Sequence, residues 1–472
     1  MAAQEANHDP MLPAPPSRAS LWVMLCGTFM VTLDFFIVMV ALPSIQRDLG
    51  ASDSALQWVV GGYGVAMAAG LITGGRLGDL FGRRRVFLVG LVMFLLASAA
   101  CGLAPSIGVL VAARVLQGLA GAVLQPQVLA MLGATYTGAA RARAFGAYAV
   151  SMGLAGVGGQ LIGGLLIESN LWGSGWRACF LINLPLGLLA LLLRARLPAA
   201  PAEKRSGGFD LMGVALAAVA LVLLVGPLVE GRQHGWPLWS LLGLAGAMPA
   251  LALLVWHINA LAKRGGQPLL PPLLFAIPSY VSGLIATLMF FSGVGSFYFV
   301  LALHLQQALG WGALASGAMF SVLAGGFFFT SMQAQALARA TRGRALVVGG
   351  VLLAVAHLLQ AGLALQGWAT AMLPVLLLQG AGLGMVMAPL ASAALADVPA
   401  LHAGVASGVL ATMQQVGNSL GVALIGILYF GGAANGTQPR GAAVAFALCL
   451  VCLAALALLV AVQARRLRQR VG

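Results

Sequence analysis

The fold is decided by residues 75–85, which read Gly75-Arg76-Leu77-Gly78-Asp79-Leu80-Phe81-Gly82-Arg83-Arg84-Arg85. This segment gathers four arginines and one aspartate between two long apolar runs, in a chain of 472 residues of which 8% are charged. In soluble domains roughly a quarter of the residues are charged. Charges that gather where one apolar run ends and the next begins indicate that the runs cross a bilayer and that the segment lies at its surface.

The composition supports this interpretation, because 61% of the residues are hydrophobic and the mean hydropathy is +0.98. A helix needs ~20 mostly apolar residues to span a bilayer. Spans must be helices or strands of a closed barrel, and these runs lack the alternation of barrel strands. The sequence therefore predicts an all-α membrane protein with about fourteen spans. The predicted spans are 21–42, 55–75, 86–104, 107–128, 143–167, 176–196, 209–229, 238–261, 277–302, 312–334, 344–364, 369–390, 403–429 and 441–463.

The basic residues orient these spans. With both termini in the cytoplasm, Lys and Arg inside outnumber those outside by about five to one, as the positive-inside rule requires. The loop Ala336–Arg344 keeps the arginines of residues 75–85 at the corresponding place in the second half, which indicates the internal repeat typical of transporters. The predicted organisation is a cytoplasmic tail (1–20), a six-helix bundle (21–197), a linker with two additional transmembrane helices (198–265), a second six-helix bundle (266–464) and a basic cytoplasmic tail (465–472).

The net charge of +14 would suggest a nucleic-acid partner in a soluble protein. Here the positive-inside rule explains it, so we expect a lipid bilayer and no nucleic acid as partner. The five cysteines lie in or beside apolar runs and match no metal-site spacing. The chain also has no catalytic Ser/His/Asp set or phosphate loop. We therefore expect no enzyme activity, no metal and no cofactor.

Three further motifs follow one another along the chain. Leu33-Asp34 precedes Val40-Ala41-Leu42-Pro43 in the first span, Arg114-Val115-Leu116-Gln117-Gly118 lies in the fourth, and residues 176–187 begin the sixth. Together with residues 75–85, they resemble the signatures of the major facilitator superfamily, and within it of the fourteen-span family of drug:proton antiporters. The resemblance implies the major facilitator fold, in which two six-helix bundles are accompanied here by two additional helices.

The chain departs from this family pattern in two places. The fifth-span signature of exporters carries a proline, whereas this sequence reads Gly159-Gln160-Leu161-Ile162-Gly163-Gly164, with Gln160 at the proline position. Beyond Glu230, the only acidic residue is Asp397, which falls in a predicted loop. Some relatives that export cationic drugs carry acids in their second-half helices, so this absence argues against a dicationic substrate.

Asp34 and Arg114 are the candidate proton-coupling residues. A carboxyl group in mid-membrane costs ~2.5–3.5 kcal/mol on insertion scales, and intramembrane acids commonly mark ion pathways. Burial favours its neutral form and a nearby cation favours its charged form, so it can exchange a proton when a gated cavity reaches it. The alternative is a permanent ion pair that holds helices together. His257 and His357 also lie in predicted spans, and we interpret them as polar packing, with proton relay as the alternative.

Residues 75–85 also supply a candidate conformational latch, made of Gly75, Gly78, Asp79 and Arg83. The glycines permit close helix approach, and Asp79 could pair with Arg83 or cap a helix of the other half. Breaking this set would couple the two halves during transport. The alternative is a topology signal made of arginines, which does not account for Asp79.

Small residues in the fifth span and amides in several spans complete the candidate sites. Gly156, Gly159, Gly163 and Gly164 predict a close-packed seam between the halves. The span at 403–429 is expected to meet the fifth span across the substrate cavity. The candidate cavity residues are Gln117, Gly121, Gln125, Gln160, Ser407, Gln414 and Asn418, whose amides could equally bind other helices.

The resemblance implies a secondary active transporter. We expect it to export amphipathic organic compounds, such as drugs or toxic metabolites, in exchange for protons by alternating access, and to work as a monomer. The expected location is a bacterial cytoplasmic (inner) membrane, with the proton gradient as the energy source. The alternatives are a dedicated exporter of one endogenous metabolite or siderophore and, more remotely, a channel.

Overall fold

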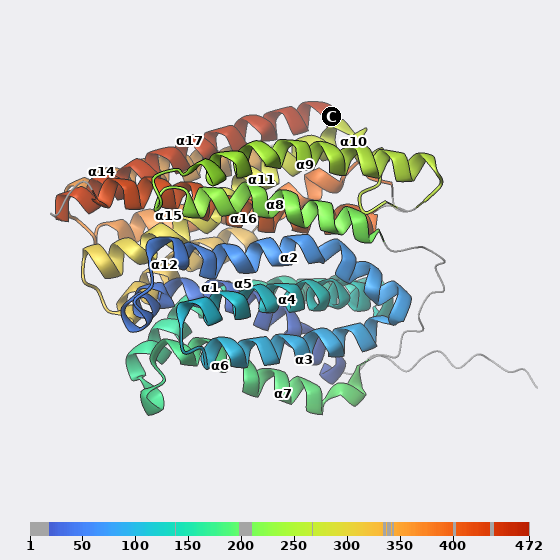
Figure 1. Ribbon diagram of the computed structural model, residues 1–472, viewed down its shortest axis with the longest axis horizontal. Coiled ribbons are helices and arrows are strands. Elements are labelled where there is room, and N and C mark those ends of the chain that lie inside the picture. Colours follow the sequence, from blue (N-terminus) through green and yellow to red (C-terminus); the bar gives the residue numbers. More distant parts are fainter. Residues whose placement is uncertain are drawn as a thin grey trace, which may run out of the picture.

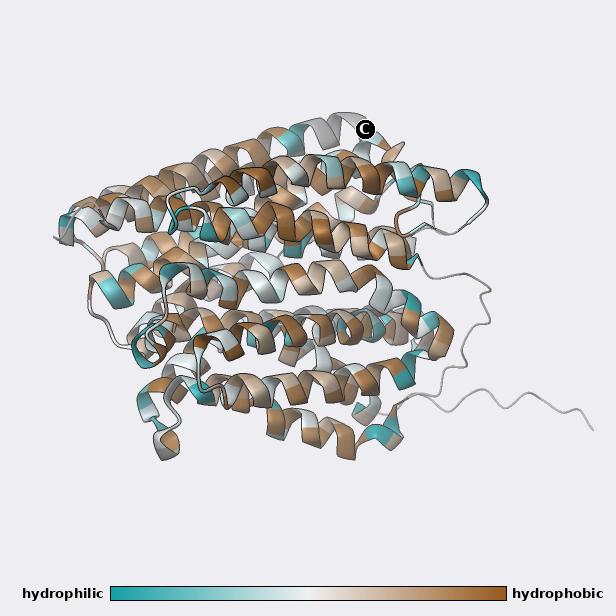
Figure 2. Ribbon diagram, in the orientation of Figure 1, coloured by the Kyte–Doolittle hydropathy of each residue, from teal (hydrophilic) through white to brown (hydrophobic). Residues whose placement is uncertain are grey.

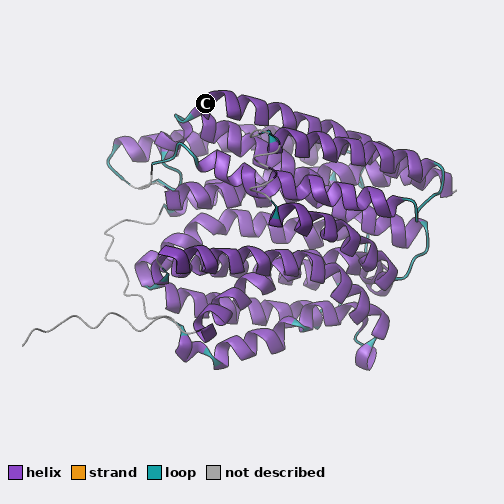
Figure 3. Cartoon of the chain, turned by 180° about the vertical axis from the view of Figure 1, so that it is seen from behind, coloured by secondary structure: helices purple, strands orange, loops and turns teal. Residues whose placement is uncertain are grey.

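A computed structural model of the protein describes residues 18–136, 138–197, 210–266, 268–333, 337, 341, 344–399, 403–434 and 439–471. These residues form helices and connecting turns, without a strand among them (Figures 1 and 3). Fourteen helices in these ranges are long and apolar enough to cross a membrane. Hydrophobic residues run along the helices and hydrophilic residues gather towards their ends (Figure 2). The prediction of an all-α multi-pass membrane protein with fourteen spans is confirmed.

The first six spans are α1 (Arg18–Leu49), α2 (Asp53–Phe81), α3 (Arg83–Gly102), α4 (Ile107–Thr135), α5 (Gly138–Ser169) and a sixth span built from η2 (Gly175–Arg177), α6 (Ala178–Leu181) and α7 (Asn183–Leu192). The two additional spans are α8 (Leu211–Glu230) and α9 (Leu238–Lys263). The last six spans are α11 (Pro278–Leu303) continued by η4 (His304–Ala308), α12 (Ala313–Met332), α14 (Ala345–Leu365), α15 (Met372–Leu395), α16 (Ala403–Ala434) and α17 (Pro439–Val471), with the short α10 (Pro272–Phe275) before α11.

Some predicted segments lie wholly or largely outside the described residues. These are residues 1–17 of the N-terminal tail, residues 198–209 of the linker, and most of the loop Ala336–Arg344. The basic cytoplasmic tail at 465–472 stays a prediction, and in the structure α17 continues as helix through this segment to Val471.

The charged segment at residues 75–85, placed by the sequence between two membrane spans, consists of two helix ends and not of a loop. Helix α2 continues to Phe81 and α3 begins at Arg83, so a single residue separates them. That residue is Gly82, whose φ of 89° is a conformation that glycine adopts readily and other residues do not. The arginines and the aspartate therefore project from two helix ends, which hold them in fixed directions.

The sixth span is a broken helix rather than a continuous one. Helix α6 ends at Leu181 and α7 begins at Asn183, with Ile182 between them. Pro185 explains the break, because it has no N–H for the carbonyl of Leu181 and its ring crowds that carbonyl. The break leaves Asn183 at the start of α7, fully buried in the first bundle.

The two halves meet along two main pairs of helices, α2 with α16 and α5 with α12, with smaller contacts between α1 and α11. The expectation that the span at 403–429 meets the fifth span is therefore wrong, since this span forms most of α16 and packs on α2. Ser419 of α16 donates a hydrogen bond of 3.3 Å to the Gly61 carbonyl of α2. The face of α5 towards the second half is already occupied by α12, where Gly317 approaches the Gln160 backbone.

The four seam glycines of α5 serve two different neighbours. Gly156, Gly159 and Gly163 lie against Phe36, Ile37 and Val40 of α1, within the first half. Gly164 lies against the backbone of Ala313 and Leu314 at the start of α12, in the second half. Small residues at such positions let helix backbones approach closely.

Gly164→Val tests the contact between the halves. A Cβ atom at Gly164 would lie 2.6 Å from the Ala313 carbonyl oxygen. Overpacking of this kind costs ~1–3 kcal/mol, so we expect a lower midpoint of thermal unfolding for the purified protein in detergent. Gly146→Val on the same helix is the matched control, because a Cβ atom there meets nothing within 4 Å. Equal losses in the two variants would contradict this account.

The two additional helices pack against each other, and α8 also contacts α2 and α16 (Figure 1). Asp210 anchors the start of α8. Its carboxylate accepts hydrogen bonds of 2.8 Å from the backbone N–H of Gly213, 2.7 Å from the His257 ring of α9 and 2.8 Å from the Leu269 N–H. His257, interpreted from the sequence as polar packing, has Asp210 as its partner. One carboxylate joins both additional helices to the chain that enters the second half.

Asp210 also gives a pH dependence. Burial opposes its ionisation, but the His257 side chain and the backbone N–H groups of Gly213 and Leu269 outweigh burial and hold the pKa of Asp210 below its usual value. The ionised carboxylate therefore stabilises the fold above the ordinary carboxyl pKa of ~3.9, and this contribution is lost as the pH falls through the lower folded-state pKa.

We expect Asp210→Asn to unfold at a lower temperature than the parent at neutral pH. The difference should shrink as the pH falls and the parent's own Asp210 becomes protonated. Unfolding midpoints measured in detergent from neutral pH downwards check this expectation. A difference that stays constant over the whole range would show that the ionised carboxylate contributes nothing.

Candidate functional site

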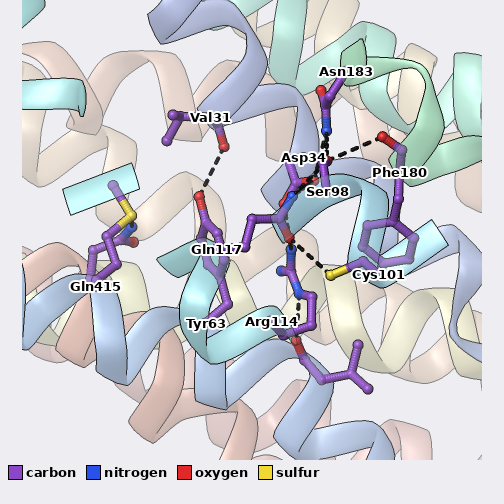
Figure 4. Close-up of polar contacts among 12 residues, drawn as sticks. Val31, Asp34, Tyr63, Ser98, Cys101, Arg114, Gln117, Phe180, Asn183 and Gln415 are labelled. Atoms are coloured by element: carbon purple, nitrogen blue, oxygen red, sulfur yellow. Dashed lines mark hydrogen bonds and ion pairs between the residues drawn. The ribbon is translucent and has the colours of Figure 1, made fainter. Parts of the chain in front are cut away.

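The interior of the first half holds a network of buried polar side chains centred on Asp34 (Figure 4). Asp34 lies on α1 and has no exposed surface. Its carboxylate forms an ion pair with Arg114 of α4. It also accepts hydrogen bonds of 2.7 Å from the Gln117 amide and 3.0 Å from the Asn183 amide. Three helices, α1, α4 and α7, thus meet at one carboxylate.

Arg114 contacts several neighbouring residues besides Asp34. Its Nε donates a hydrogen bond of 2.9 Å to the Val59 carbonyl of α2, and its Nη1 also donates to the Gln117 amide oxygen at 2.7 Å. The guanidinium carbon lies 4.2 Å from the centre of the Tyr63 ring and 5.7 Å from that of Phe180. Rings at these distances attract a cation through their faces. Arg114 is fully buried, and its Nη2 has no hydrogen-bond partner.

Ser98 of α3 completes the network. The amides of Gln117 and Asn183 donate hydrogen bonds of 2.9 Å and 2.8 Å to its hydroxyl oxygen. The hydroxyl in turn donates to the Phe180 carbonyl at 3.2 Å. Each amide therefore bridges Ser98 and Asp34. A displacement of the carboxylate would change hydrogen bonds to residues of α3, α4 and α7 together.

The ion pair expected between Asp34 and Arg114 is present, whereas three of its supporting residues were not identified from the sequence. Asn183 was noted as part of the sixth-span motif, but nothing assigned it a contact. Its place just before Pro185, at a helix break, is the signal that could have pointed to it. Ser98 and Tyr63 stand in runs of small or apolar residues and carried no such signal.

This arrangement can take up a proton with a defined consequence. Two ions withdrawn from water carry a large desolvation penalty, which only good geometry and further hydrogen bonds offset. The donors around Asp34 meet both needs while it is ionised. Protonation would remove the charge that holds Arg114 and would leave a neutral acid among several donors, so the network would have to rearrange.

The candidate latch residues lie together but within one half. Asp79 and Arg83 form an ion pair of 3.2 Å, and Arg83 also donates to the Ala130 carbonyl of α4 at 3.1 Å. Gly78 packs over the Gln127 side chain of α4, and a Cβ atom at Gly75 would lie 3.9 Å from Pro126. The contact towards the second half comes from Arg76, which donates to the Pro268 carbonyl at 2.7 Å.

The candidate cavity residues fall into separate groups instead of one site. Gln117 belongs to the Asp34 network, and a Cβ atom at Gly121 would lie 3.3 Å from the Tyr63 hydroxyl. Gln160 donates a 2.9 Å hydrogen bond to the Phe36 carbonyl of α1. Gln125 of α4 is half-buried and contacts Tyr148 of α5.

The remaining candidates belong to α16, where Ser407 and Gln414 are half-buried. Asn418 donates a 3.2 Å hydrogen bond to Gln415. Gln415, which sequence reasoning missed, donates to the Met67 sulfur of α2 at 2.7 Å. Gln415 therefore faces the first half at the α2–α16 contact, whereas Asn418 lies against Gly295 of α11 within the second half.

The second half has a neutral polar set. Gln360 of α14 donates a 2.5 Å hydrogen bond to Gln379 of α15. His357 lies one turn away with its ring centre 5.4 Å from that of Phe297. A cavity of about 20 Å³ adjoins His357 and Gln379, with room for a single water molecule. Among the described residues no group of three or more His, Cys, Asp or Glu is arranged to hold a metal ion.

Fourteen membrane-spanning helices in two contacting halves, with a charged signature at the α2–α3 junction, define a secondary transporter fold. The chain belongs to the Major Facilitator Superfamily, whose family model matches residues 24–422. It is 38% identical over 430 residues to a probable actinorhodin transporter of Streptomyces coelicolor, a match that covers 89% of this chain and 74% of the relative. It is also 38% identical over 447 residues to a puromycin resistance protein of Streptomyces alboniger, which covers 90% of this chain and 86% of the relative.

A solved structure shares the fold. The crystal structure of a bacterial homologue of the human lysosomal transporter Spinster matches with a TM-score of 0.67, over 95% of this chain and 96% of that chain, at 16% sequence identity. The similarity extends over almost the whole chain, so the fold assigned from the sequence is confirmed.

Removing one member of the Asp34–Arg114 ion pair should lower the stability of the protein more than removing both charges. Arg114→Met leaves the Asp34 carboxylate buried without a cation, and loss of one partner of a buried pair costs ~3–5 kcal/mol. Combining Arg114→Met with Asp34→Asn removes both charges and keeps an amide that can pair with Gln117 and Asn183. We expect the double variant to recover most of the lost unfolding temperature in detergent. A double variant no more stable than Arg114→Met would mean that the ion pair is not what holds these helices.

Proposed function

We propose that this protein exports amphipathic organic compounds across a bacterial cytoplasmic membrane in exchange for protons. The buried carboxyl group of Asp34 carries this proposal, because a charge placed in the middle of a membrane span is costly and is retained where it moves ions. The two relatives are named for actinorhodin transport and for puromycin resistance, both of which concern organic antibiotics. Their similarity over most of this chain supports an organic substrate here too.

The contacts between the halves support alternating access. Two hydrogen bonds join the halves near the C-terminal ends of α1 and α5. Gln306 of η4 donates a 3.0 Å hydrogen bond to the Val40 carbonyl of α1, and the Leu314 N–H of α12 donates to Glu168 of α5 at 3.3 Å. With both termini in the cytoplasm, these contacts lie at the outer side and hold it closed. Substrate would then enter between the halves from the cytoplasm or the inner leaflet, and leave after the outer contacts break.

Helix α1 provides the path from the proton site to the second half. Asp34 points into the first bundle, while Phe36, two residues along, contacts Tyr298 of α11 with ring centres 5.0 Å apart. Tyr298 in turn stacks on Phe320 of α12 at 5.1 Å. A shift of α1 that accompanies protonation of Asp34 therefore moves a residue at the contact between the halves. In the proposed cycle Asp34 takes up a proton when the outer side is open and releases it to the cytoplasm.

The charges of the second half bear on the substrate. Among its described residues the only carboxylate is Asp397, which accepts a 2.6 Å hydrogen bond from Ser279 near the start of α11. A dication would find no carboxylate inside the spans of this half, so uncharged or singly charged amphipathic compounds fit best. The proposal needs no cofactor or catalytic group, since the proton gradient supplies the energy, and a single chain contains both halves.

A second candidate is the dedicated export of one endogenous metabolite. The relative named as an actinorhodin transporter favours it, since that name gives a single compound. The two candidates differ in substrate range and not in mechanism. A panel of unrelated amphipathic drugs tested on the same proteoliposomes separates them: several transported compounds indicate multidrug export, and one indicates a dedicated exporter.

Asp34→Asn tests proton coupling. The amide keeps hydrogen-bonding capacity but cannot bind and release a proton, so we expect the loss of transport driven by an imposed pH gradient in proteoliposomes. Substrate binding to the purified variant should persist and shows that it is folded. Asp48→Asn is the matched control on the same helix, because Asp48 pairs with Arg177 at the outer helix end. Gradient-driven transport that survives in Asp34→Asn would rule out this residue as the coupling group.

A further inference from the structure

The loop between the two additional helices is fastened to the start of α2. We call this set of three contacts the outer clamp. It consists of the Trp58 indole N–H donating to Glu230 at 2.8 Å, the ion pair of Arg232 with Asp53 at 3.3 Å, and the Ser54 hydroxyl donating to Gln233. Three of the six residues belong to the first two turns of α2, Glu230 ends α8, and Arg232 and Gln233 lie in the turn that follows, on the side opposite to Asp210.

Helix α8 touches both halves of the transporter at the place where they meet. Val225 and Val229 of α8 are buried in one cluster with Val65 of α2 and Ala423 of α16. The Arg232 guanidinium carbon lies 5.7 Å from the centre of the Phe430 ring of α16. In Figure 1, α8 lies beside α2 and in front of α16. The additional helices therefore bridge the α2–α16 contact instead of attaching to one half alone.

Beneath α8, the outer parts of α2 and α16 are in close contact. Gln57 of α2 is buried against Gly426 of α16. Ser419 of α16 is buried against the backbone of Gly61 and Gly64. Separation of α2 from α16 at this level requires α8 to lose its contacts with one of them.

The inner end of the additional helices is fastened more firmly than the outer end. Asp210 is buried and accepts three hydrogen bonds, one of them from Leu269, in the segment that leads into the second half. At the outer end, the side chains of Arg232 and Asp53 are 25% and 37% exposed. An exposed ion pair contributes little and exchanges readily with water. The outer clamp is therefore the end that can release.

From these contacts we propose that the two additional helices control the opening of the outer side. While the outer clamp is formed, α8 holds the outer ends of α2 and α16 together, and its release allows them to part. This inference rests on the proposed alternating access, but it concerns the balance between closed and open states and not the proton or the substrate. Weakening the outer clamp shifts that balance towards the outward-open state.

The test uses a cysteine as a reporter of outward opening. Ser419→Cys places a thiol in the α2–α16 contact, and its rate of reaction with a membrane-impermeant maleimide added outside measures how often that contact opens. The clamp variant is the pair Glu230→Leu and Arg232→Leu, which removes one charge of each sign. We expect labelling to accelerate by roughly tenfold, the effect of losing one hydrogen bond to a charged group.

Two controls make the result decisive. Trp239→Leu changes an exposed residue of α9 whose ring contacts His234 and which is no part of the outer clamp, so labelling should match the parent reporter. The clamp variant without Ser419→Cys keeps the native buried cysteines, and faster labelling of these would reveal unfolding instead of opening. An unchanged reporter rate in the clamp variant overturns the inference.

The measurement needs neither substrate nor a pH gradient. A clamp variant that labels faster supports the inference even if Asp34→Asn still transports, in which case the proposed coupling alone fails. Conversely, normal labelling in the clamp variant together with the loss of gradient-driven transport in Asp34→Asn leaves the proposed function intact and removes the role of the outer clamp.

Discussion

The buried ion pair between Asp34 and Arg114 is the constraint on which the first half depends. Neither side chain has exposed surface, and a charge in such a place is tolerated only with its partner and with further hydrogen bonds. The surrounding helices supply those bonds from Gln117 and Asn183, and the rings of Tyr63 and Phe180 enclose the cation. The broken sixth span belongs to this arrangement, because the break brings an amide to the carboxylate.

The sequence predicted what hydrophobicity and charge determine directly. The number of spans follows from apolar length, and the pairing of Asp34 with Arg114 follows because an isolated arginine in lipid is unfavourable. The sequence did not predict which helices of the two halves touch. Gly61 and Gly64 of α2 permit close helix packing as well as the glycines of α5 do, so the glycines alone do not distinguish the two helices. That α2 packs on α16 depends on how the two bundles are placed relative to each other, and a local sequence pattern does not contain this information.

Side-chain contacts between segments far apart in the sequence could not be predicted either. Asp210 and His257 are 47 residues apart, and Trp58 and Glu230 are 172 apart. Each of these residues alone looks like an ordinary helix-end or interfacial residue, and only the tertiary structure shows the partner. The charged signature at residues 75–85 illustrates the same point at short range. Its charges indicated a segment between two spans, but not that the single residue Gly82 turns the chain between two helices.

The neutral polar set of the second half has a consequence for how such a protein can diversify. Among the described residues, no Asp, Glu, Lys or Arg side chain is buried there. Substitutions in that half can change the surface that contacts the substrate without leaving a buried charge unpaired. In the first half, a substitution at the ion pair would leave one charge without its partner. New substrate preferences should therefore accumulate in the second half, which has no buried charge among its described residues. The first half has to keep the residues that surround its buried ion pair.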